Sequence, residues 1–202
     1  MDTPLDAGHM TTPVTIPIYT IGYGTRSVEQ LLAILSARQI AYVIDIRSSP
    51  YSRYKPEFNK DALEREIRAH QIRYTSMGDT LGGRPNDPDC YSDDKVDYDK
   101  IRQKGFYHQG IARLQQAFAQ QARVVLLCSE GKPENCHRSK LIGETLTGLG
   151  IPVVHIDEND QLVSQSAVIA RLTAGQLSLF GSYGFTSRKR YMSPADEEEE
   201  DA

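Results

Sequence analysis

The chain has 202 residues and a formal net charge of −4 at pH 7, which suits one domain with short tails. No apolar run approaches the roughly 18 residues of a membrane helix, and the first residues lack the basic and apolar segments of a secretory signal. The three cysteines, Cys90, Cys128 and Cys136, are an odd number. These features argue against a membrane protein and against a secreted protein held by disulfides, and they predict a cytoplasmic protein with free thiols.

Strand and helix patterns alternate along the chain. Strands are predicted over residues 14–24, 41–46, 72–77, 122–128 and 151–156, and helices over 27–39, 60–70, 98–121, 139–150 and 165–174. Such alternation predicts a three-layer α/β fold, with a mostly parallel sheet and helices on both faces. We expect a disordered segment over 1–15, a single α/β domain over 16–174 and a tail with an acidic end over 175–202.

Unusual polar and glycine residues follow the ends of the predicted strands. The first strand is followed by "GYGTRS", the second by "DIRSSPYSRYK", the fourth by "SEGKPENCHR" and the fifth by "HIDEND". In open parallel sheets, ligands bind outside the carboxyl ends of the strands. We therefore expect five residues to converge there: Asp45, Arg47, Cys128, His137 and Arg138.

The stretch "LLCSEGKPENCHRSK" carries the densest chemistry, because Cys128 ends a strand and Cys136 begins a helix. The predicted helix buries a stripe of five residues: Leu141, Ile142, Thr145, Leu146 and Leu149. One turn earlier this stripe reaches His137 and Arg138, so both side chains should face the cleft above the sheet. The helix N-terminus adds positive potential, and the Arg138 guanidinium would hold a phosphate or carboxylate through two hydrogen bonds.

Four interpretations of this stretch stay open. A thiolate nucleophile would act with His137 or Arg138, but cysteine-dependent phosphatases and sulfurtransferases use a tighter loop than the nine residues between Cys128 and Arg138. A metal site would draw on Cys128, Cys136, His137 and His155, but neighbouring Cys136 and His137 would struggle to bind one ion. The third interpretation is a non-covalent anion or nucleotide site. The fourth is structural, with packed thiols and Arg138 capping a strand. We favour the anion site and assign neither a metal nor a cofactor.

Four phrases occur in order along the chain: "YTIGYGTRS", "VIDIRSSPYSRYKPEFN", "IRYTSMGDTLGG", and "LLCSEGKPENCHRSKLIG" followed by "VVHI". Through them, residues 18–156 resemble the bacterial and archaeal family known as domain of unknown function 488. The phrase with Cys-His-Arg is the most specific. The resemblance implies a compact α/β fold with these loops gathered at one place. It implies no established reaction, so the anion site rests on the residues alone.

Asp45 and Arg47 leave the second strand together. Asp45 is a candidate general base, metal ligand or partner that orients His137, and its alternative role is pairing with a neighbouring arginine. The loop that follows alternates cations, including Arg53 and Lys55, with aromatic rings. Such a loop suits a nucleic-acid strand, with phosphates on the cations and bases on the rings. A solvated loop with its rings tucked underneath is the alternative.

The tail contains the pentapeptide "QLSLF", which resembles the motif by which bacterial polymerases and repair proteins dock on the sliding clamp. Leu177, Leu179 and Phe180 would fill apolar pockets, and Gln176 would form a hydrogen bond at the rim. A short exposed peptide of this kind needs no fold of its own. The alternative is an apolar strip that folds back on the core.

The leading hypothesis is that the protein acts on nucleic acid or a nucleotide. If it is an enzyme, we expect a hydrolase or transferase in DNA maintenance. The candidate catalytic residues are Asp45, Cys128 and His137. The candidate ligand-binding residues are Gly22, Gly24, Arg47, Arg53, Lys55, Cys136 and Arg138. One alternative is a non-catalytic adaptor that binds nucleic acid and the clamp. Another is a cysteine-dependent redox or sulfur-transfer enzyme.

Overall fold

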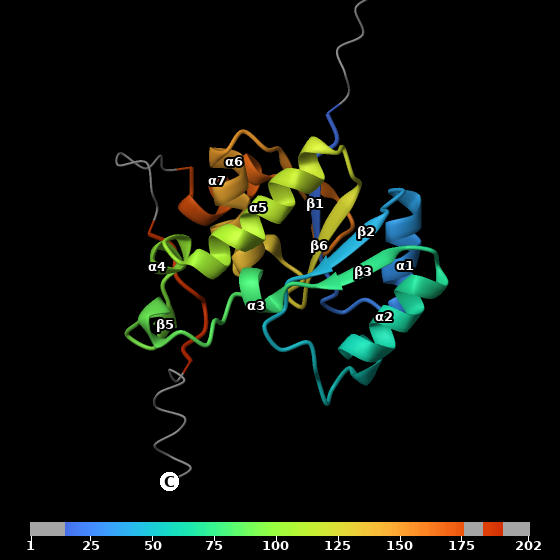
Figure 1. The fold of residues 1–202 in the computed structure, drawn as a ribbon, viewed down its shortest axis with the longest axis horizontal. Coiled ribbons are helices and arrows are strands. Elements are labelled where there is room, and N and C mark those ends of the chain that lie inside the picture. Colours follow the sequence, from blue (N-terminus) through green and yellow to red (C-terminus); the bar gives the residue numbers. More distant parts are fainter. Residues whose placement is uncertain (1–14, 176–183, 192–202) are drawn as a thin grey trace, which may run out of the picture.

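A six-stranded sheet forms the centre of the protein in the computed structural model, which describes residues 15–175 and 184–191 (Figure 1). The strand order is β3-β2-β6-β1-β7-β8. The strands are β1 (Ile18–Gly22), β2 (Tyr42–Asp45), β3 (Arg73–Ser76), β6 (Val124–Cys128), β7 (Val153–Ile156) and β8 (Leu162–Ser164). All neighbouring pairs are parallel except β7 with β8. The short antiparallel edge strand β8 was not predicted.

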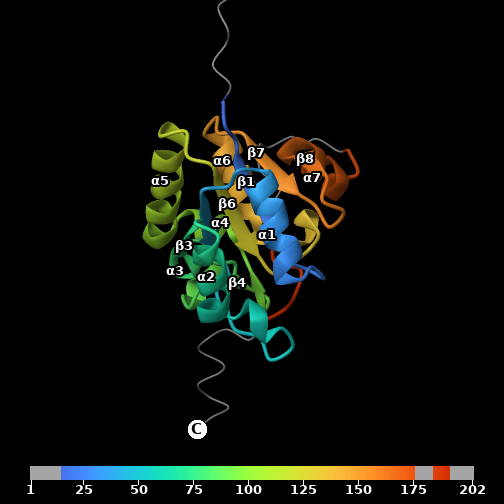
Figure 2. The same ribbon diagram turned by 90° about the vertical axis from the view of Figure 1, so that its right-hand side faces the viewer.

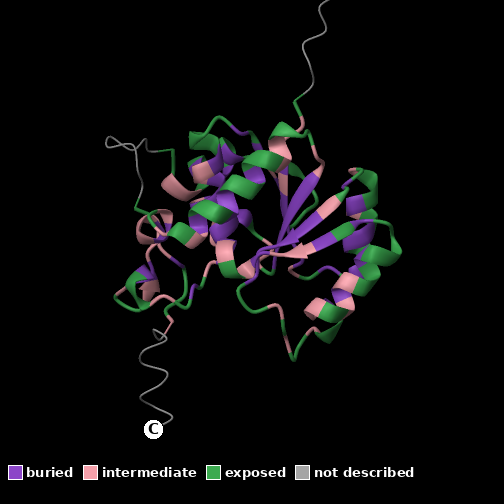
Figure 3. Ribbon diagram, viewed as in Figure 1, coloured by how far each residue is buried: buried purple, intermediate pink, exposed green. Residues whose placement is uncertain are grey.

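Helices cover both faces of this sheet, which confirms the predicted three-layer α/β fold (Figures 1 and 2). One face packs against α1 (Val28–Ala37) and α2 (Lys60–Ala69). The other packs against α4 (Tyr98–Arg102), α5 (Gly105–Ala119) and α6 (Glu144–Gly148). The last helix, α7 (Gln165–Thr173), contacts β7 and β8. Figure 3 shows the buried strands between these layers.

The first helix follows from its sequence. Ser27 caps it. The Ser27 hydroxyl accepts from the Gln30 backbone N–H and the Gln30 side chain accepts from the Ser27 N–H, so the two residues form a capping box. Its buried side chains are Val28, Leu31, Leu32 and Leu35. This stripe at helical spacing fixes the face that α1 presents to the sheet.

Smaller elements complete the described chain. They are η1 (Pro56–Phe58), α3 (Gly78–Leu81), η2 (Pro88–Cys90), η3 (Pro133–Asn135), η4 (Arg138–Gly143), and the hairpin of β4 (Tyr91–Ser92) with β5 (Lys95–Val96). The helix predicted over 139–150 is π-helical in η4 and α-helical only in α6. Leu149, predicted to be buried, is 50% exposed, and it is the C-cap residue that follows the last turn of α6. Among the described residues, no helix is long and apolar enough to cross a membrane.

Residues 184–191, which the sequence analysis assigned to the tail, pack back on the domain. Thr186 forms a bridge with Asp97, and the Ser187 N–H donates to the Val96 carbonyl at 2.9 Å. Phe185 packs against the core on the α5 side of the sheet. This segment thereby brings Ser187, Arg188, Lys189 and Tyr191 to the lining of the cavity described below.

Candidate functional site

The site is built on β6, whose five residues are all buried because the strand lies between β1 and β2. Its last residue, Cys128, pairs in register with Gly22 at the end of β1. The chain then turns through η3 and returns to the same place at Cys136, just before η4. Strand and π-helix therefore deliver two thiols to the carboxyl edge of the sheet, where open α/β folds bind their ligands.

The two thiols touch. Cys136 Sγ lies 3.1 Å from Cys128 Sγ, and the Nδ1 atom of His137 lies 3.6 Å from Cys136 Sγ and 4.0 Å from Cys128 Sγ. All three side chains are buried, and both cysteines are free. The backbone N–H of Arg138 also donates to Cys136 Sγ at 3.4 Å. The sequence thus brings two sulfur atoms and one imidazole nitrogen into direct contact.

The two thiols differ in acidity. The pKa of Cys128 is well below its usual value, because Cys136 donates a hydrogen bond to it and the charges of His137 and Arg138 favour the thiolate against the opposing effect of burial. The pKa of Cys136 is raised, by burial and then by the Cys128 neighbour. The surroundings therefore favour the thiolate form on Cys128 and the thiol form on Cys136, which donates the hydrogen bond between them. By contrast, burial raises the pKa of Cys90 to about 11.

A cavity of about 190 Å³ opens onto this pair. Its lining residues are Arg47, Ser48, Ser49, Gly83, Arg84, Tyr98, Cys128, Ser129, Glu130, Asn135, Cys136, His137, Ser187, Arg188, Lys189 and Tyr191. The Nε2 atom of His137 is buried and has no hydrogen-bond partner. Buried polar atoms usually have a partner, and this nitrogen is an exception beside the two thiols.

Gly83 sets the position of the His137 ring. A Cβ atom at this position would lie 2.6 Å from the ring's Cγ and Nδ1 atoms, so only glycine lets the imidazole sit beside the thiols. Gly83 therefore makes room for a side chain of the protein itself.

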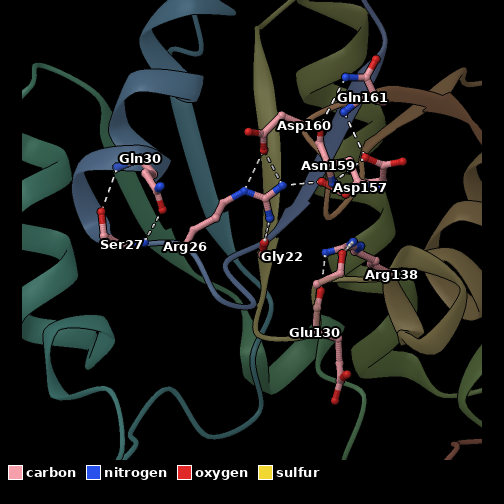
Figure 4. A network of polar contacts seen from close by, with 11 residues as sticks. Gly22, Arg26, Ser27, Gln30, Glu130, Arg138, Asp157, Asn159, Asp160 and Gln161 are labelled. Atoms are coloured by element: carbon pink, nitrogen blue, oxygen red, sulfur yellow. Dashed lines mark hydrogen bonds and ion pairs between the residues drawn. The ribbon is translucent and has the colours of Figure 1, made fainter.

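Arg138 is fully buried and faces inward, as the helix phase predicted. Its guanidinium donates to the Glu130 carbonyl at 2.9 Å and to the Gly131 carbonyl at 2.7 Å (Figure 4). A Cβ at Gly22 would meet that Glu130 carbonyl at 1.7 Å, so Gly22 admits the loop rather than a ligand. Arg138 thus fastens the turn between the two cysteines, and its predicted contact with an anion stays a prediction.

Arg26 was not singled out in the sequence, although it is buried and fastens the same edge of the sheet. It donates to the Gly22 carbonyl at 2.6 Å and to the Asp160 carboxylate at 2.9 Å (Figure 4). Gly24, which has a φ of +50°, donates its N–H to the Ser129 carbonyl at 3.0 Å. The loops after β1, β6 and β7 are therefore tied together, which holds the end of β6 in place.

Asp45 lies next to the thiol site but has partners of its own. Its carboxylate accepts from the Arg47 Nε atom at 2.9 Å and from the Tyr74 hydroxyl at 2.6 Å. Arg47 also donates to the Phe58 carbonyl at 2.8 Å. This set matches the alternative role expected for Asp45, pairing with a neighbouring arginine. Arg47 itself lines the cavity.

Residues 51–55 of the predicted ligand-binding loop lie outside the cavity lining. Arg53 and the exposed rings of Tyr51 and Tyr54 border a separate surface hollow. Lys55 donates to the Arg26 carbonyl at 2.9 Å and lies over the ring of Phe58. The structure therefore gathers Arg47, Cys128, Cys136 and His137 at one cavity and leaves Arg53 and Lys55 outside it.

Cys128, Cys136 and His137 are also a possible set of metal ligands, because one donor atom from each lies within 4.8 Å of the others. The expected difficulty of binding one ion with neighbouring Cys136 and His137 does not arise in this geometry. His155, the fourth residue considered, is engaged elsewhere, with Thr20 at 2.7 Å and Gln165 at 2.6 Å. Burial lowers the pKa of His155 to about 4, so it stays neutral.

Several cavity residues escaped the sequence analysis. Arg84 and Tyr98 come from segments interpreted as loop and helix, and Arg188, Lys189 and Tyr191 come from the assigned tail. No local sequence pattern indicates these residues. Arg188, Lys189 and Tyr191 reach the site only because residues 184–191 pack against the domain. The clamp-like residues Gln176, Leu177, Leu179 and Phe180 lie outside the described residues, and their role stays a prediction.

The fold and the site define a three-layer α/β protein with a buried dithiol at the carboxyl edge of its parallel sheet. A family model described as "Domain of unknown function DUF488" matches residues 27–144, which is more than half of the chain. The protein therefore belongs to this family, as the resemblance of its motifs indicated. Neither the comparison with curated proteins nor the comparison with solved structures found a match.

Proposed function

We propose that the protein is a thiol-dependent oxidoreductase in which Cys128 attacks a small disulfide and Cys136 completes the exchange. The observation that carries this proposal is the 3.1 Å contact between the two sulfur atoms, with the lower pKa on Cys128. A thiolate is the nucleophile in thiol–disulfide exchange, and a second thiol within contact distance resolves the mixed disulfide. The thiols lie at the base of a cavity that would admit a small substrate.

The reaction has two displacement steps. The Cys128 thiolate attacks one sulfur of the substrate disulfide, whose S–S bond breaks and releases one thiolate product. Cys136 then loses its proton, and its thiolate attacks the Cys128 sulfur, which releases the second product and leaves a Cys128–Cys136 disulfide. Two cysteines are oxidised and one disulfide is reduced to two thiols. A small dithiol reductant would restore the starting state by the same chemistry.

His137 is placed to move the proton in the second step. Its Nδ1 atom is 3.6 Å from Cys136 Sγ, and its Nε2 atom is free of protein partners. An imidazolium in this position would give its proton to the first departing thiolate, and the neutral ring would then accept the Cys136 proton. Arg138 would act indirectly, by fastening the turn between the cysteines and by favouring the Cys128 thiolate through its charge.

The test uses a neutral small disulfide, bis(2-hydroxyethyl) disulfide, with products identified by mass spectrometry. The reduced protein should form an internal Cys128–Cys136 disulfide. Cys136→Ser should instead accumulate the mixed disulfide on Cys128, because the resolving thiol is missing. Cys128→Ser should stay unmodified on the timescale of the first reaction. Cys90→Ser is the matched control, since its thiol is buried and its pKa is raised, and it should behave as the unsubstituted protein.

Two results would reject the proposal. One is a mixed disulfide that persists on Cys128 although Cys136 is present. The other is one equivalent of zinc in protein purified without added metal, together with thiols that react only after chelation. That second result would establish a metal centre on Cys128, Cys136 and His137, because thiolates bound to an ion are not free nucleophiles.

A second candidate function is binding of single-stranded nucleic acid by the loop that follows β2. The observation in its favour is exposure: Tyr51 is 58% and Tyr54 91% exposed, with Arg53 between them. Exposed rings that alternate with cations suit bases and phosphates. Fluorescence titration with a single-stranded oligonucleotide would test this, and binding should weaken as salt rises. Tyr54→Ala should weaken it, whereas Arg65→Ala on α2 should not. Equal binding by both variants would reject this role.

A further inference from the structure

The cavity above the dithiol has an excess of positive charge. Arg84, Arg188 and Lys189 line it, and among the described lining residues Glu130 is the one carboxylate. Arg47 adds no net charge, because Asp45 neutralises it. Arg188 lies 3.7 Å from Glu130, at the outer limit of an ion pair, and both side chains are partly exposed. Glu130 therefore offsets one of the three cations, and the lining keeps an excess of positive charge.

The charge of Arg188 also acts on Lys140. Burial lowers the pKa of Lys140, and the charges of Arg188 and Lys95 lower it further, against the opposing effect of Cys136. The hydroxyl-bearing residues Ser48, Ser49, Ser129 and Ser187 also line the cavity, and serine hydroxyls are suitable donors to an oxyanion.

We propose that the dithiol site is selective for small anionic substrates, and that Arg188 and Lys189 supply this selectivity. The inference rests on the proposed thiol chemistry and names its substrate class: a small disulfide that carries a carboxylate, sulfonate or phosphate group. The cavity of about 190 Å³ has the volume of roughly six waters at about 30 Å³ each, which suits the reactive end of a small molecule.

Arg188 and Lys189 come from the returning segment 184–191, which lies outside the family match over residues 27–144. The thiols and His137 lie inside that match. The reactive groups therefore belong to the part of the chain that defines the family, and the two cations belong to a segment beyond it. Chemistry and substrate preference would then reside in separate parts of this chain.

The test compares two alkylating reagents of similar size, iodoacetate and iodoacetamide, which differ by one negative charge. In both reactions the Cys128 thiolate displaces iodide, and the modified cysteine is identified by peptide mass mapping. The measured quantity is the ratio of the rate constants, with the same cysteine in denatured protein as the reference. The folded protein should favour iodoacetate about threefold to tenfold relative to this reference, because one or two cations lie near the sulfur.

The Arg188→Ala/Lys189→Ala double variant should return the ratio to the reference value, and Lys189→Glu should lower the ratio below that of the unsubstituted protein. Arg190→Ala is the matched control, because Arg190 is on the same segment but pairs with Asp94 at 3.6 Å outside the cavity lining. All these side chains are exposed, and circular dichroism would verify the fold. The preference should fade from about 0.01 M to about 1 M salt, as the Debye length falls from roughly 30 Å to roughly 3 Å.

The outcomes separate the two proposals. If Cys128 reacts rapidly with iodoacetamide but shows no preference for iodoacetate, the thiol chemistry stands and anion selectivity is overturned. A preference that survives the double variant would overturn the assignment to Arg188 and Lys189. If Cys128 reacts with neither reagent while the protein is folded, the proposed function fails, and the selectivity fails with it.

Discussion

Two buried polar sets lie side by side at the carboxyl edge of the sheet, and they differ in how fully they are satisfied. The first, which we call the β2 set, consists of Asp45, Arg47 and Tyr74. Asp45 at the end of β2 accepts hydrogen bonds from Arg47 and from Tyr74 of β3, and Arg47 also donates to a backbone carbonyl. The second, which we call the β6 set, consists of Cys128 at the end of β6, Cys136 and His137. The two thiols are in contact, and the Nε2 atom of His137 is buried with no partner. Arg47 lines the same cavity as the thiols, so the two sets are neighbours.

The difference separates structure from chemistry. A set whose donors and acceptors are all paired holds loops in place, and any change to it costs stability. A set with a displaced pKa and an unpaired atom is poised for a reactant, and a change to it costs reactivity first. Under the proposed function, the β2 set would hold the edge of the sheet in place and the β6 set would carry the reaction.

The largest expected effect is on stability, in the β2 set. Asp45→Ala removes the partner of Arg47 and leaves a buried charge without compensation. We expect a loss of about 3–5 kcal/mol in the free energy of unfolding, measured by urea denaturation. Glu66→Ala, at an exposed position on α2, is the matched control and should change stability by less than about 0.5 kcal/mol.

The same variant tests the comparison itself. Cys128 alkylation per folded molecule should persist in Asp45→Ala under conditions where the protein is folded. If the variant is stable but its thiolate has lost its reactivity, Asp45 belongs to the reactive set, and the division between the two sets is wrong.

A smaller effect is expected where the backbone meets His137. Gly83→Ala would place a Cβ 2.6 Å from the ring, and relief of that overlap should cost about 1–3 kcal/mol of stability. The displaced ring should also slow Cys128 alkylation. Gly105→Ala is the control, because nothing lies within 4 Å of its added Cβ. Unchanged stability and reactivity in Gly83→Ala would show that the ring does not depend on this contact.

Much of the fold follows from local pattern. The apolar run of β6 and the alternation of strands with helices were sufficient to predict a three-layer α/β fold. The rule for parallel sheets also predicted one site at the carboxyl ends of the strands, formed by Asp45, Arg47, Cys128, His137 and Arg138. These signals are readable because they depend on spacing within a few turns or strands.

The rest depends on contacts between distant segments. The roles of Arg138 and Gly22 could not be read locally, because both are set by the Glu130 carbonyl. Leu149 is exposed because the helix ends at Gly148, one residue earlier than the buried stripe requires. Arg188 and Lys189 line the cavity only because residues 184–191 pack against the domain, and no sequence periodicity indicates such packing. Long-range packing therefore decided which of the predicted residues line the cavity.

The smallest expected effect concerns the thiolate itself. His137 is one cause of the low pKa of Cys128, after the hydrogen bond from Cys136. His137→Gln keeps a polar side chain but removes the ring's charge, so the pKa of Cys128 should rise. Alkylation by iodoacetamide should then reach half its maximum at a higher pH. At a pH below both midpoints the rate should fall about tenfold for each unit of the shift, because less thiolate is present.

His108→Gln is the control, since His108 is exposed and bonds to the Arg102 carbonyl. Rates measured from about pH 4 to about pH 9 would give both midpoints. A midpoint that stays in place in His137→Gln would assign the low pKa to Cys136 and Arg138 alone, and His137 would then lose its place in the reactive set.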